Sequence, residues 1–345
     1  MSTNNKVVWY EGMFLQPQHF QQQDRHVDYI LNRKAKLNGD HFWGFDKLEL
    51  DHELLSVGKI AIREASGIFE DGTVFDIPNV DAPPAPFDIG ENIANVTLYL
   101  AIPEKKTGVA DTGVQSEDSP LRYFSVKSEV ADVIADSKQV SDMQIGSLAT
   151  RIISDQRELN GYSYLSITRI AETKSNHKIF MDKAFIPTCS AISVSKSLTN
   201  FVTEVHGLLN HRGQMLAERL TDSQAAGTAE VVDFVLLQMI NRYEPLFHHL
   251  TQQKTVHPEA LYKLLLQLMG EMSTFTNDKR RPIEAPKYDH KQLFVTYKPL
   301  IHTLRQALSM VLEQNATSVL LESRDHGSWV GQIHDKKIIS TCRFI

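Results

Sequence analysis

The stretch from Glu230 to Phe275 constrains the fold most, because it has the longest unbroken helical periodicity of apolar residues in the chain. Apolar residues at spacings of three and four form a stripe along its first half, and a second apolar row lies beside that stripe. A break over 251–257 separates this half from a similar pattern. So short a connection predicts an antiparallel helical hairpin. The stripe consists of Val232, Leu236, Met239, Tyr243, Leu246 and Leu250.

The width of this apolar arc indicates what must cover it. Burying one Val, Leu, Ile or Phe side chain stabilises a fold by about 1.5 to 3 kcal/mol. A whole domain is stable by only about 5 to 15 kcal/mol, so an arc of this size cannot stay in water. We therefore expect flanking helices of the same chain and further copies of the chain to share it, with the stripe at the core of an oligomer.

Length and composition restrict the classes of function. The 345 residues predict about two domains, and a hydrophobic content of 42% is ordinary for a globular protein. A net charge of −6 without a long basic run argues against nucleic acid or an anionic membrane as the main partner. Cys189 and Cys342 lie far apart and fit a reducing compartment. The sequence shows neither a signal-peptide pattern nor a membrane-spanning run, so we expect a cytoplasmic protein without direct membrane insertion.

Between residues 43 and 186 the apolar pattern has a period of two. Short alternating runs separated by turn residues, with no helices between them, predict an antiparallel β-sandwich. Asp71-Gly72 lies between two apolar pairs and predicts a hairpin turn, since glycine accepts a positive φ. The expected strands lie at 48–50, 60–62, 68–69, 74–75, 96–102, 122–130, 142–153, 162–170 and 179–186.

The opening stretch, residues 9–20, mixes large apolar residues with glycine and proline and is typical of neither a helix nor a strand. Its large side chains either enter the core of their own domain, as such residues commonly do, or form a docking surface for a partner. A helical pattern follows over 20–37. We call the candidate contact residues the N-terminal strip: Trp9, Tyr10, Met13, Phe14 and Leu15.

Helical periodicity returns after residue 190, and beyond residue 315 the period is two again. Pro245 and Pro299 each remove a backbone donor inside a helical pattern and predict kinks. The predicted helices cover 198–220, 228–250, 258–275 and 289–311, and the predicted late strands cover 319–321, 329–333 and 338–345.

A search for catalytic chemistry finds no phosphate-binding loop, no Gly-x-Ser-x-Gly elbow and no Cys-x-x-Cys pair. Glu244 and His248 are one helical turn apart and His257 follows, so a metal-dependent hydrolase is one interpretation. A zinc site needs three or four convergent ligands, and this spacing is common by chance, which favours solvated or core-edge histidines. We expect no enzyme activity, no metal and no cofactor.

Several spaced motifs resemble the TssK family (ImpJ/VasE), the baseplate subunits of the bacterial type VI secretion system. They follow the order of that family and extend from about residue 7 to about residue 320. The motifs are WYEGMFLQPQHF at 9–20, FEDGTVFDIP at 69–78, LQMINRYEPL at 237–246, HPEALY at 257–262 and YDH at 288–290.

The resemblance implies a multidomain protein with α and β parts. Residues 1–190 would form a shoulder β-sandwich similar to that of phage receptor-binding proteins, 191–315 a four-helix neck, and 316–345 the beginning of a β-rich head that continues beyond Ile345. It also implies a non-enzymatic adaptor that forms a homotrimer through shoulder and neck. The shoulder would bind the baseplate subunits TssF and TssG, and the head the cytoplasmic parts of the inner-membrane proteins TssL and TssM.

The residue patterns agree with a binding or scaffold protein. A β domain without a catalytic constellation favours a binding module, and the wide apolar arc favours self-association. An alternative hypothesis is a phage tail fibre or receptor-binding protein, which would share the trimer and the sandwich but recognise a cell-surface glycan. We expect a trimeric linker in the cytoplasm, at the baseplate that is anchored to the inner membrane.

Overall fold

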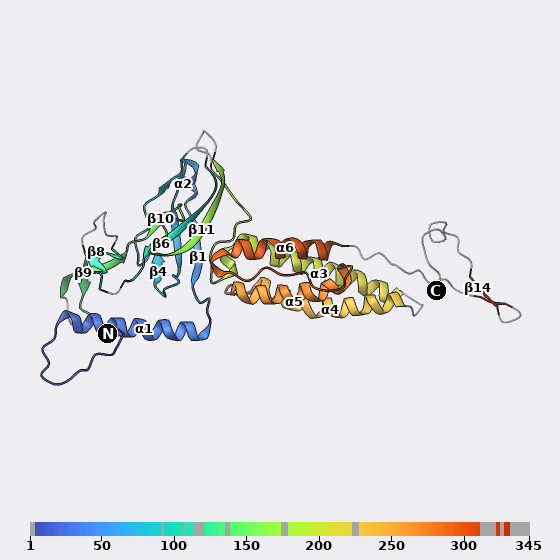
Figure 1. Ribbon diagram of the computed structural model, residues 1–345, viewed down its shortest axis with the longest axis horizontal. Helices are drawn as coiled ribbons and strands as arrows, with labels where there is room; N and C mark the ends of the chain where they lie inside the picture. Colours follow the sequence, from blue (N-terminus) through green and yellow to red (C-terminus); the bar gives the residue numbers. More distant parts are fainter. Residues whose placement is uncertain are drawn as a thin grey trace. The chain divides into compact units, whose positions relative to one another are not determined.

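The computed structural model describes residues 4–90, 93–106, 108–113, 121–134, 139–173, 179–222, 228–310, 322–324 and 328–331 (Figure 1). The chain divides into two compact units. The first unit contains residues 1–202, 251–267 and 284–303, and the second contains 203–250, 268–283 and 304–345. Four of the long helices contribute one end to each unit, so the division does not test the domain boundaries expected at 190 and 315.

Two antiparallel sheets dominate the β-rich part of the first unit. The three-stranded sheet has the order β1-β3-β4, with β1 (Gly44–Leu50), β3 (Ile62–Ile68) and β4 (Val74–Ile77). The four-stranded sheet has the order β10-β6-β11-β12, with β6 (Ala94–Pro103), β10 (Arg151–Ile153), β11 (Tyr162–Thr173) and β12 (Ile179–Met181).

Smaller β elements complete this part of the chain. β2 (Lys59–Ile60) pairs with β5 (Phe87–Asp88), and a short helix α2 (His52–Ser56) precedes them. A third sheet has the order β7-β8-β9, with β7 (Thr112–Gly113), β8 (Tyr123–Ala131) and β9 (Val140–Leu148). Within the described residues, the antiparallel pairing that we expected holds for every named strand pair except β7 with β8, which is parallel. The packing of two sheets as a sandwich stays a prediction.

The core of the first unit centres on β6, whose residues 98–103 are all buried. A strand that is covered on both faces has a continuous apolar run instead of an alternating one. Its neighbour β11 is buried at most positions as well, including Leu165, Ile167 and Ile170.

Three of the strand predictions were wrong at their ends. The run expected at 60–62 is divided, because Ile60 ends β2, which pairs with β5, whereas Ile62 begins β3, which pairs with β1. The run expected at 142–153 is two strands, because the chain changes partner at Ala149 and Thr150: β9 pairs with β8, whereas β10 pairs with β6. The strand expected at 179–186 ends at Met181, where Asp182 starts a turn by accepting a hydrogen bond from the Ala184 amide at 2.9 Å.

The predicted hairpin turn between β3 and β4 is present, and a buried arginine holds it. Gly72 has a φ of 89°, in the region that favours glycine. Arg122 is only 3% exposed and donates to the Pro103 carbonyl at 2.5 Å, to the Asp71 carboxylate at 2.6 Å and to the Thr73 hydroxyl. One guanidinium therefore joins the turn, the end of β6 and the start of β8.

The predicted helices are present, with small shifts at their ends. Pro258 opens its helix at a position where the missing amide costs nothing. Asp289 caps a 3-10 turn by accepting from the Lys291 amide at 2.9 Å, and the last helix follows that turn. Pro245 and Pro299 lie inside helices, and kinks there stay predictions. The elements are α1 (Pro17–Asn38), η1 (Ile192–Val194), α3 (Lys196–Asp222), α4 (Thr228–Gln252), α5 (Pro258–Thr276), η2 (His290–Gln292) and α6 (Leu293–Ser309).

Late in the chain, β13 (Glu322–Arg324) pairs antiparallel with β14 (Ser328–Val330). β14 coincides with the beginning of the strand expected at 329–333. The strands expected at 319–321 and 338–345 lie outside the described residues.

We expect Arg122→Met to lower the free energy of unfolding by about 3 to 5 kcal/mol, because it leaves Asp71 and the Pro103 carbonyl without their buried donor. Chemical denaturation followed by circular dichroism measures this difference. Arg63→Met is the matched control, since Arg63 is exposed on β3 and its replacement should change stability by less than about 0.5 kcal/mol. Equal stability of the two variants would contradict the role of Arg122.

Candidate interaction surfaces

The N-terminal strip lies on the surface of the first unit. Phe14 is 84% exposed and Trp9 45%, Tyr10 and Leu15 are also exposed, and Met13 is partly buried. The interpretation in which these side chains enter the core of their own domain is therefore wrong for Trp9 and Phe14 in the single chain. Their exposure is consistent with the docking hypothesis.

A tight turn shapes the strip. The Met13 amide donates to the Tyr10 carbonyl at 3.4 Å, and Gly12 between them has a φ of 76°. The Trp9 ring lies 6.2 Å from the His19 ring and 6.3 Å from the Phe20 ring, measured between centroids. The strip is thus folded back toward the first turn of α1.

Further contacts fix the segment to α1. Gln16 precedes the helix, and its backbone amide donates a hydrogen bond to His19 Nδ1 at 3.0 Å. This bond satisfies one of the backbone donors that have no partner inside the helix. Pro17 takes the first helical position. The Gln22 side-chain amide donates to the Asn5 carbonyl at 2.7 Å, so the residues that precede the strip are attached to the same helix.

Helix α1 buries none of its 22 residues. It contacts the β-rich part through an ion pair of Asp28 with Lys105 at 3.2 Å and through Asn32, which lies against Gly72. A Cβ atom at Gly72 would overlap with the side-chain oxygen of Asn32, so only glycine at the hairpin turn lets the helix approach this closely. The exposed apolar residues of α1 are Phe20, Val27, Tyr29, Ile30, Leu31 and Leu37.

The six residues of the stripe on α4 differ in burial within the single chain. Leu236, Met239 and Tyr243 are buried, whereas Val232 and Leu246 are exposed. The remaining member, Leu250, is partly exposed. Intrachain packing therefore covers the middle of the stripe, and the oligomer core that we assigned to these six residues stays a prediction.

A tyrosine can occupy the buried stripe because its hydroxyl has a partner. Tyr243 donates to the Glu271 carboxylate of α5 at 2.8 Å, and Arg242 forms an ion pair with the same carboxylate at 2.7 Å. Burial raises the pKa of Tyr243, and the bond to Glu271 raises it further, so the hydroxyl remains a donor. The apolar ring of Tyr243 is thus buried in the helical bundle, while its hydroxyl is bonded to a carboxylate.

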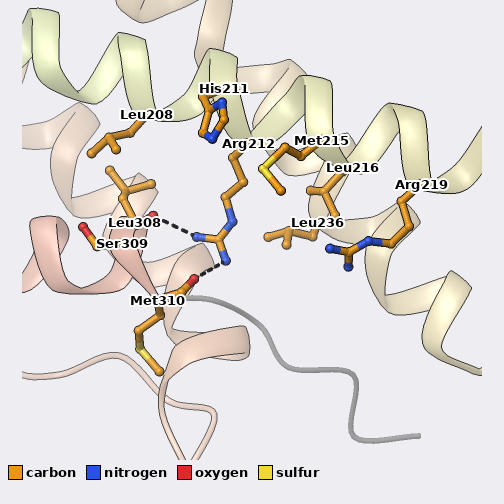
Figure 2. A pocket seen from close by; sticks show the side chains of 10 residues that line it. All are labelled: Leu208, His211, Arg212, Met215, Leu216, Arg219, Leu236, Leu308, Ser309 and Met310. Carbon is orange, nitrogen blue, oxygen red and sulfur yellow. Dashed lines mark hydrogen bonds between the residues drawn. The ribbon is translucent and has the colours of Figure 1, made fainter. Parts of the chain in front are cut away.

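A groove of about 360 Å³ lies in the second unit, between α3 and the end of α6 (Figure 2). Arg212 reaches across it and donates to the carbonyls of Ala307 at 3.3 Å, Leu308 at 3.2 Å and Met310 at 3.0 Å. The last carbonyls of a helix lack intrahelical partners and carry partial negative charge. Arg212 thus caps α6. The lining residues are Leu208, His211, Arg212, Met215, Leu216, Arg219, Leu236, Leu308, Ser309 and Met310.

Three histidines stack in the first unit, where the residues that precede β1 meet α5 and η2. The ring centroid of His290 lies 5.0 Å from that of His41 and 5.2 Å from that of His257. His257 Nε2 is 2.7 Å from the His41 carbonyl, and the Glu259 amide donates to His257 Nδ1 at 3.1 Å. A carbonyl only accepts and an amide only donates, so these partners select the neutral ring with hydrogen on Nε2.

The same logic applies to His290. Its Nε2 donates to the Trp43 carbonyl at 2.8 Å, which leaves Nδ1 to accept from the Tyr288 hydroxyl at 2.7 Å. The pKa of His257 is lowered and that of His290 is lowered to about 4, mainly because both rings are buried and partly because each lies beside other histidines. His257 and His290 are therefore uncharged at neutral pH.

The metal-site candidates do not come together in the structure. Glu244 accepts a hydrogen bond from the Asn210 amide at 2.7 Å, and the His248 ring lies 5.1 Å from that of His206. His257 belongs to the histidine stack. Among the described residues, no group of three His, Cys, Asp or Glu side chains is placed to hold a metal ion. Within the same residues, no helix combines the length and apolarity needed to cross a membrane.

Comparison with known proteins finds relatives over the whole chain. The model of a bacterial type VI secretion family, with the names VC_A0110, EvfL, ImpJ and VasE, matches residues 19–345. The type VI secretion system baseplate component TssK1 of Pseudomonas aeruginosa strain PAO1 is 37% identical over all of this chain and 78% of the relative.

Solved structures give the same result. A crystal structure of TssK has a TM-score of 0.86 and 37% identity, and covers 98% of this chain and 76% of that chain. A chain of a type VI secretion TssK-TssF-TssG baseplate subcomplex, determined by cryo-electron microscopy, has a TM-score of 0.76 and 26% identity. That match covers 89% of this chain and 99% of the other.

The fold and these relatives define a bacterial type VI secretion protein. More specifically, the chain belongs to the VasE (ImpJ) family, whose TssK relatives are components of the secretion baseplate. The family resemblance carried by the sequence motifs is thereby confirmed. The names of the relatives indicate a structural part of the baseplate and no catalytic activity.

We expect the free energy of unfolding to decrease as the pH falls from about 6.5 to about 4. The pKa values of His257 and His290 in the folded chain lie below the ordinary 6.5, so the unfolded chain binds more protons in this range. Their stabilising contribution is complete above pH 6.5 and is lost as the pH approaches the folded pKa values. Denaturation curves at a series of pH values measure the slope.

The variant His290→Gln keeps one donor and one acceptor but does not titrate. It should show a shallower loss of stability below pH 6.5 than the unmodified protein, whatever its stability at neutral pH. His52→Gln, at an exposed position in α2, is the matched control and should keep the original slope. An unchanged slope in His290→Gln would exclude His290 as a source of the acid sensitivity.

Proposed function

We propose that this chain is a structural adaptor of the type VI secretion baseplate, which forms a homotrimer and binds TssF and TssG through its N-terminal part. The proposal includes a link to the inner-membrane proteins TssL and TssM through the C-terminal head, on the cytoplasmic side of the membrane. The observation that carries it is the exposed N-terminal strip beside the unburied helix α1. Similarity to TssK in a TssK-TssF-TssG subcomplex supports the choice of partners.

The chemistry of the strip suits a protein interface. Trp and Tyr are enriched among the residues that dominate binding energy, because each provides a large rigid area and a polar tip. Trp9, Tyr10 and Phe14 provide such area on a segment that Gln22 attaches to α1. The ion pair of Asp28 and the contact of Asn32 with Gly72 hold α1 against the β-rich part. A partner would therefore meet a largely preformed surface.

The homotrimer is proposed from the exposed side of α4. Val231, Val232, Phe234, Val235 and Leu246 are all exposed there, and contiguous apolar patches on a soluble protein commonly mark interfaces. The contacts with TssL and TssM are proposed from the family resemblance, since the described part of the head is limited to β13, β14 and Gly331.

Alanine substitution tests the docking surface. The double variant Trp9→Ala with Phe14→Ala should recover at least about tenfold less TssF and TssG by co-purification, which corresponds to about 1.4 kcal/mol of lost binding energy. Trp329→Ala is the matched control, since Trp329 is an exposed tryptophan of β14 in the head region, and its capture of TssF and TssG should be unchanged. Full recovery with the double variant, at unchanged circular dichroism, would remove the strip from the interface.

Absolute mass tests the trimer. Light scattering after size exclusion should give three times the chain mass of 39.1 kDa, at several concentrations and at both low and high salt. The mass should resist salt because apolar contacts, unlike exposed ion pairs, are not screened. A monomer at all concentrations would contradict the homotrimer.

A further inference from the structure

Side-chain contacts in the second unit show which parts of its helices lie at the same level along the bundle. The Asn210 side-chain amide of α3 donates to the Glu244 carboxylate of α4 at 2.7 Å. The Tyr243 hydroxyl of α4 donates to the Glu271 carboxylate of α5 at 2.8 Å. These bonds place three stretches of helix side by side. We call them the central layer: 207–213 of α3, 241–247 of α4 and 268–273 of α5.

The glycines of the helices gather in this layer. Among the described residues, three glycines lie inside helices, and all three belong to the central layer: Gly207 and Gly213 of α3 and Gly270 of α5. Glycine disfavours a helix more than any residue except proline, because its backbone loses the most freedom when the helix forms. Their positions therefore weaken α3 and α5 at one level.

Two of these glycines have no packing reason within the chain. A Cβ atom at Gly207 or Gly270 would meet nothing within 4 Å, and neither residue has a positive φ. Gly213 differs, since its Cβ atom would lie 3.2 Å from Ile240 of α4. Close packing of two helices therefore accounts for Gly213 alone. Gly207 and Gly270 weaken their helices without gaining a contact inside the chain.

The other two helices are also weak at this level. Pro245 lies inside α4 and has no amide, so the helical hydrogen bond that would join it to the Asn241 carbonyl cannot form. α6 reaches the layer only with its last turn, where Arg212 of α3 binds the Leu308 carbonyl (Figure 2). It ends at Ser309 and provides no continuous helix beyond the layer.

The common level of these weak points matters more than their number. A weak point in one helix of a bundle has little effect when its neighbours are intact there, because packed helices can bend only together. Glycine and proline are the usual sites of helix bending, and here they coincide across the bundle. The side-chain bonds of the layer run from helix to helix, so they keep the helices in register without stiffening any one of them along its axis.

We infer that the central layer is a flexure, at which the helical bundle opens and bends before its other parts do. Proteins open locally in cooperative units, at a lower free energy than global unfolding requires. The flexure lets the far parts of α3 and α4, residues 214–222 and 228–240, change direction without separating the helices. It is a property of the chain itself and does not depend on the proposed partners.

Hydrogen exchange of the full chain, followed by mass spectrometry, tests the flexure. Gly207→Ala strengthens α3 and adds no contact to α4 or α5. If the layer opens as one unit, exchange should slow by about fivefold at 207–213 and also at 241–247 and 268–273. Gly270→Ala should slow the same three stretches from the side of α5. Slowing that stays within the substituted helix would overturn the inference, because the weak points would then act separately.

Asn200→Ala is the matched control. Asn200 is exposed in α3, about two turns before Gly207, and alanine favours the helix there as well. This variant should leave exchange at 241–247 and 268–273 unchanged. If Asn200→Ala slowed these stretches as much as Gly207→Ala does, the effect would be one of global stability, and the inference would be wrong.

The mass of the glycine variants decides against a different use of the open space. If Gly207 or Gly270 let another molecule approach the helix closely, alanine at that position should lower the particle mass measured by light scattering. A lowered mass, or faster exchange in the layer, overturns the inference. An unchanged mass together with slower exchange in all three helices supports it.

Discussion

Helix α4 carries more apolar surface than its neighbours in the chain cover, and this excess organises the helical part of the protein. Leu236, Met239 and Tyr243 are packed inside, so one side of α4 is stabilised by its own bundle. The other side keeps Val231, Phe234 and the residues around them in contact with solvent. Burying one such side chain contributes about 1.5 to 3 kcal/mol. This is a tenth or more of the roughly 5 to 15 kcal/mol by which a whole domain is stable. A second surface, from outside the chain's own bundle, is therefore needed to remove these side chains from water.

Polar side chains connect the helices and strands to one another through hydrogen bonds. Arg122 binds a strand-end carbonyl and a turn carboxylate, and Arg212 binds the last carbonyls of α6. His257 and His290 bind the carbonyls of His41 and Trp43. In each case a side chain from one part of the sequence satisfies backbone groups that secondary structure leaves unpaired elsewhere. Elements that are far apart in the sequence are thereby held at a defined angle.

The helices were predictable because their periodicity extends over many residues. The hairpin turn was predictable as well, because Asp71-Gly72 has a local mechanism. The strand boundaries were less predictable. No residue pattern between β9 and β10 indicates that the chain changes its pairing partner there. The exposure of Trp9 and Phe14 was left open by sequence reasoning, because residue type alone does not decide burial in an irregular segment.

Long-range partners were beyond sequence reasoning altogether. The carbonyls that accept from Arg212 lie 95 to 98 residues further along the chain. The same holds for His290 and Trp43, which are 247 residues apart. A buried Arg122 has no pattern that distinguishes it from an exposed arginine. Motif resemblance identified the family, but not these contacts.

The cap that Arg212 places on α6 also has a mechanical meaning. Three hydrogen bonds connect one guanidinium to consecutive parts of the α6 terminus, and they act in parallel. A pull on the backbone at Met310 would therefore have to break the bonds of Arg212 as well as the hydrogen bonds of the last turn of α6. The end of α6 is therefore better protected against fraying than a helix end whose last carbonyls have no side-chain donor.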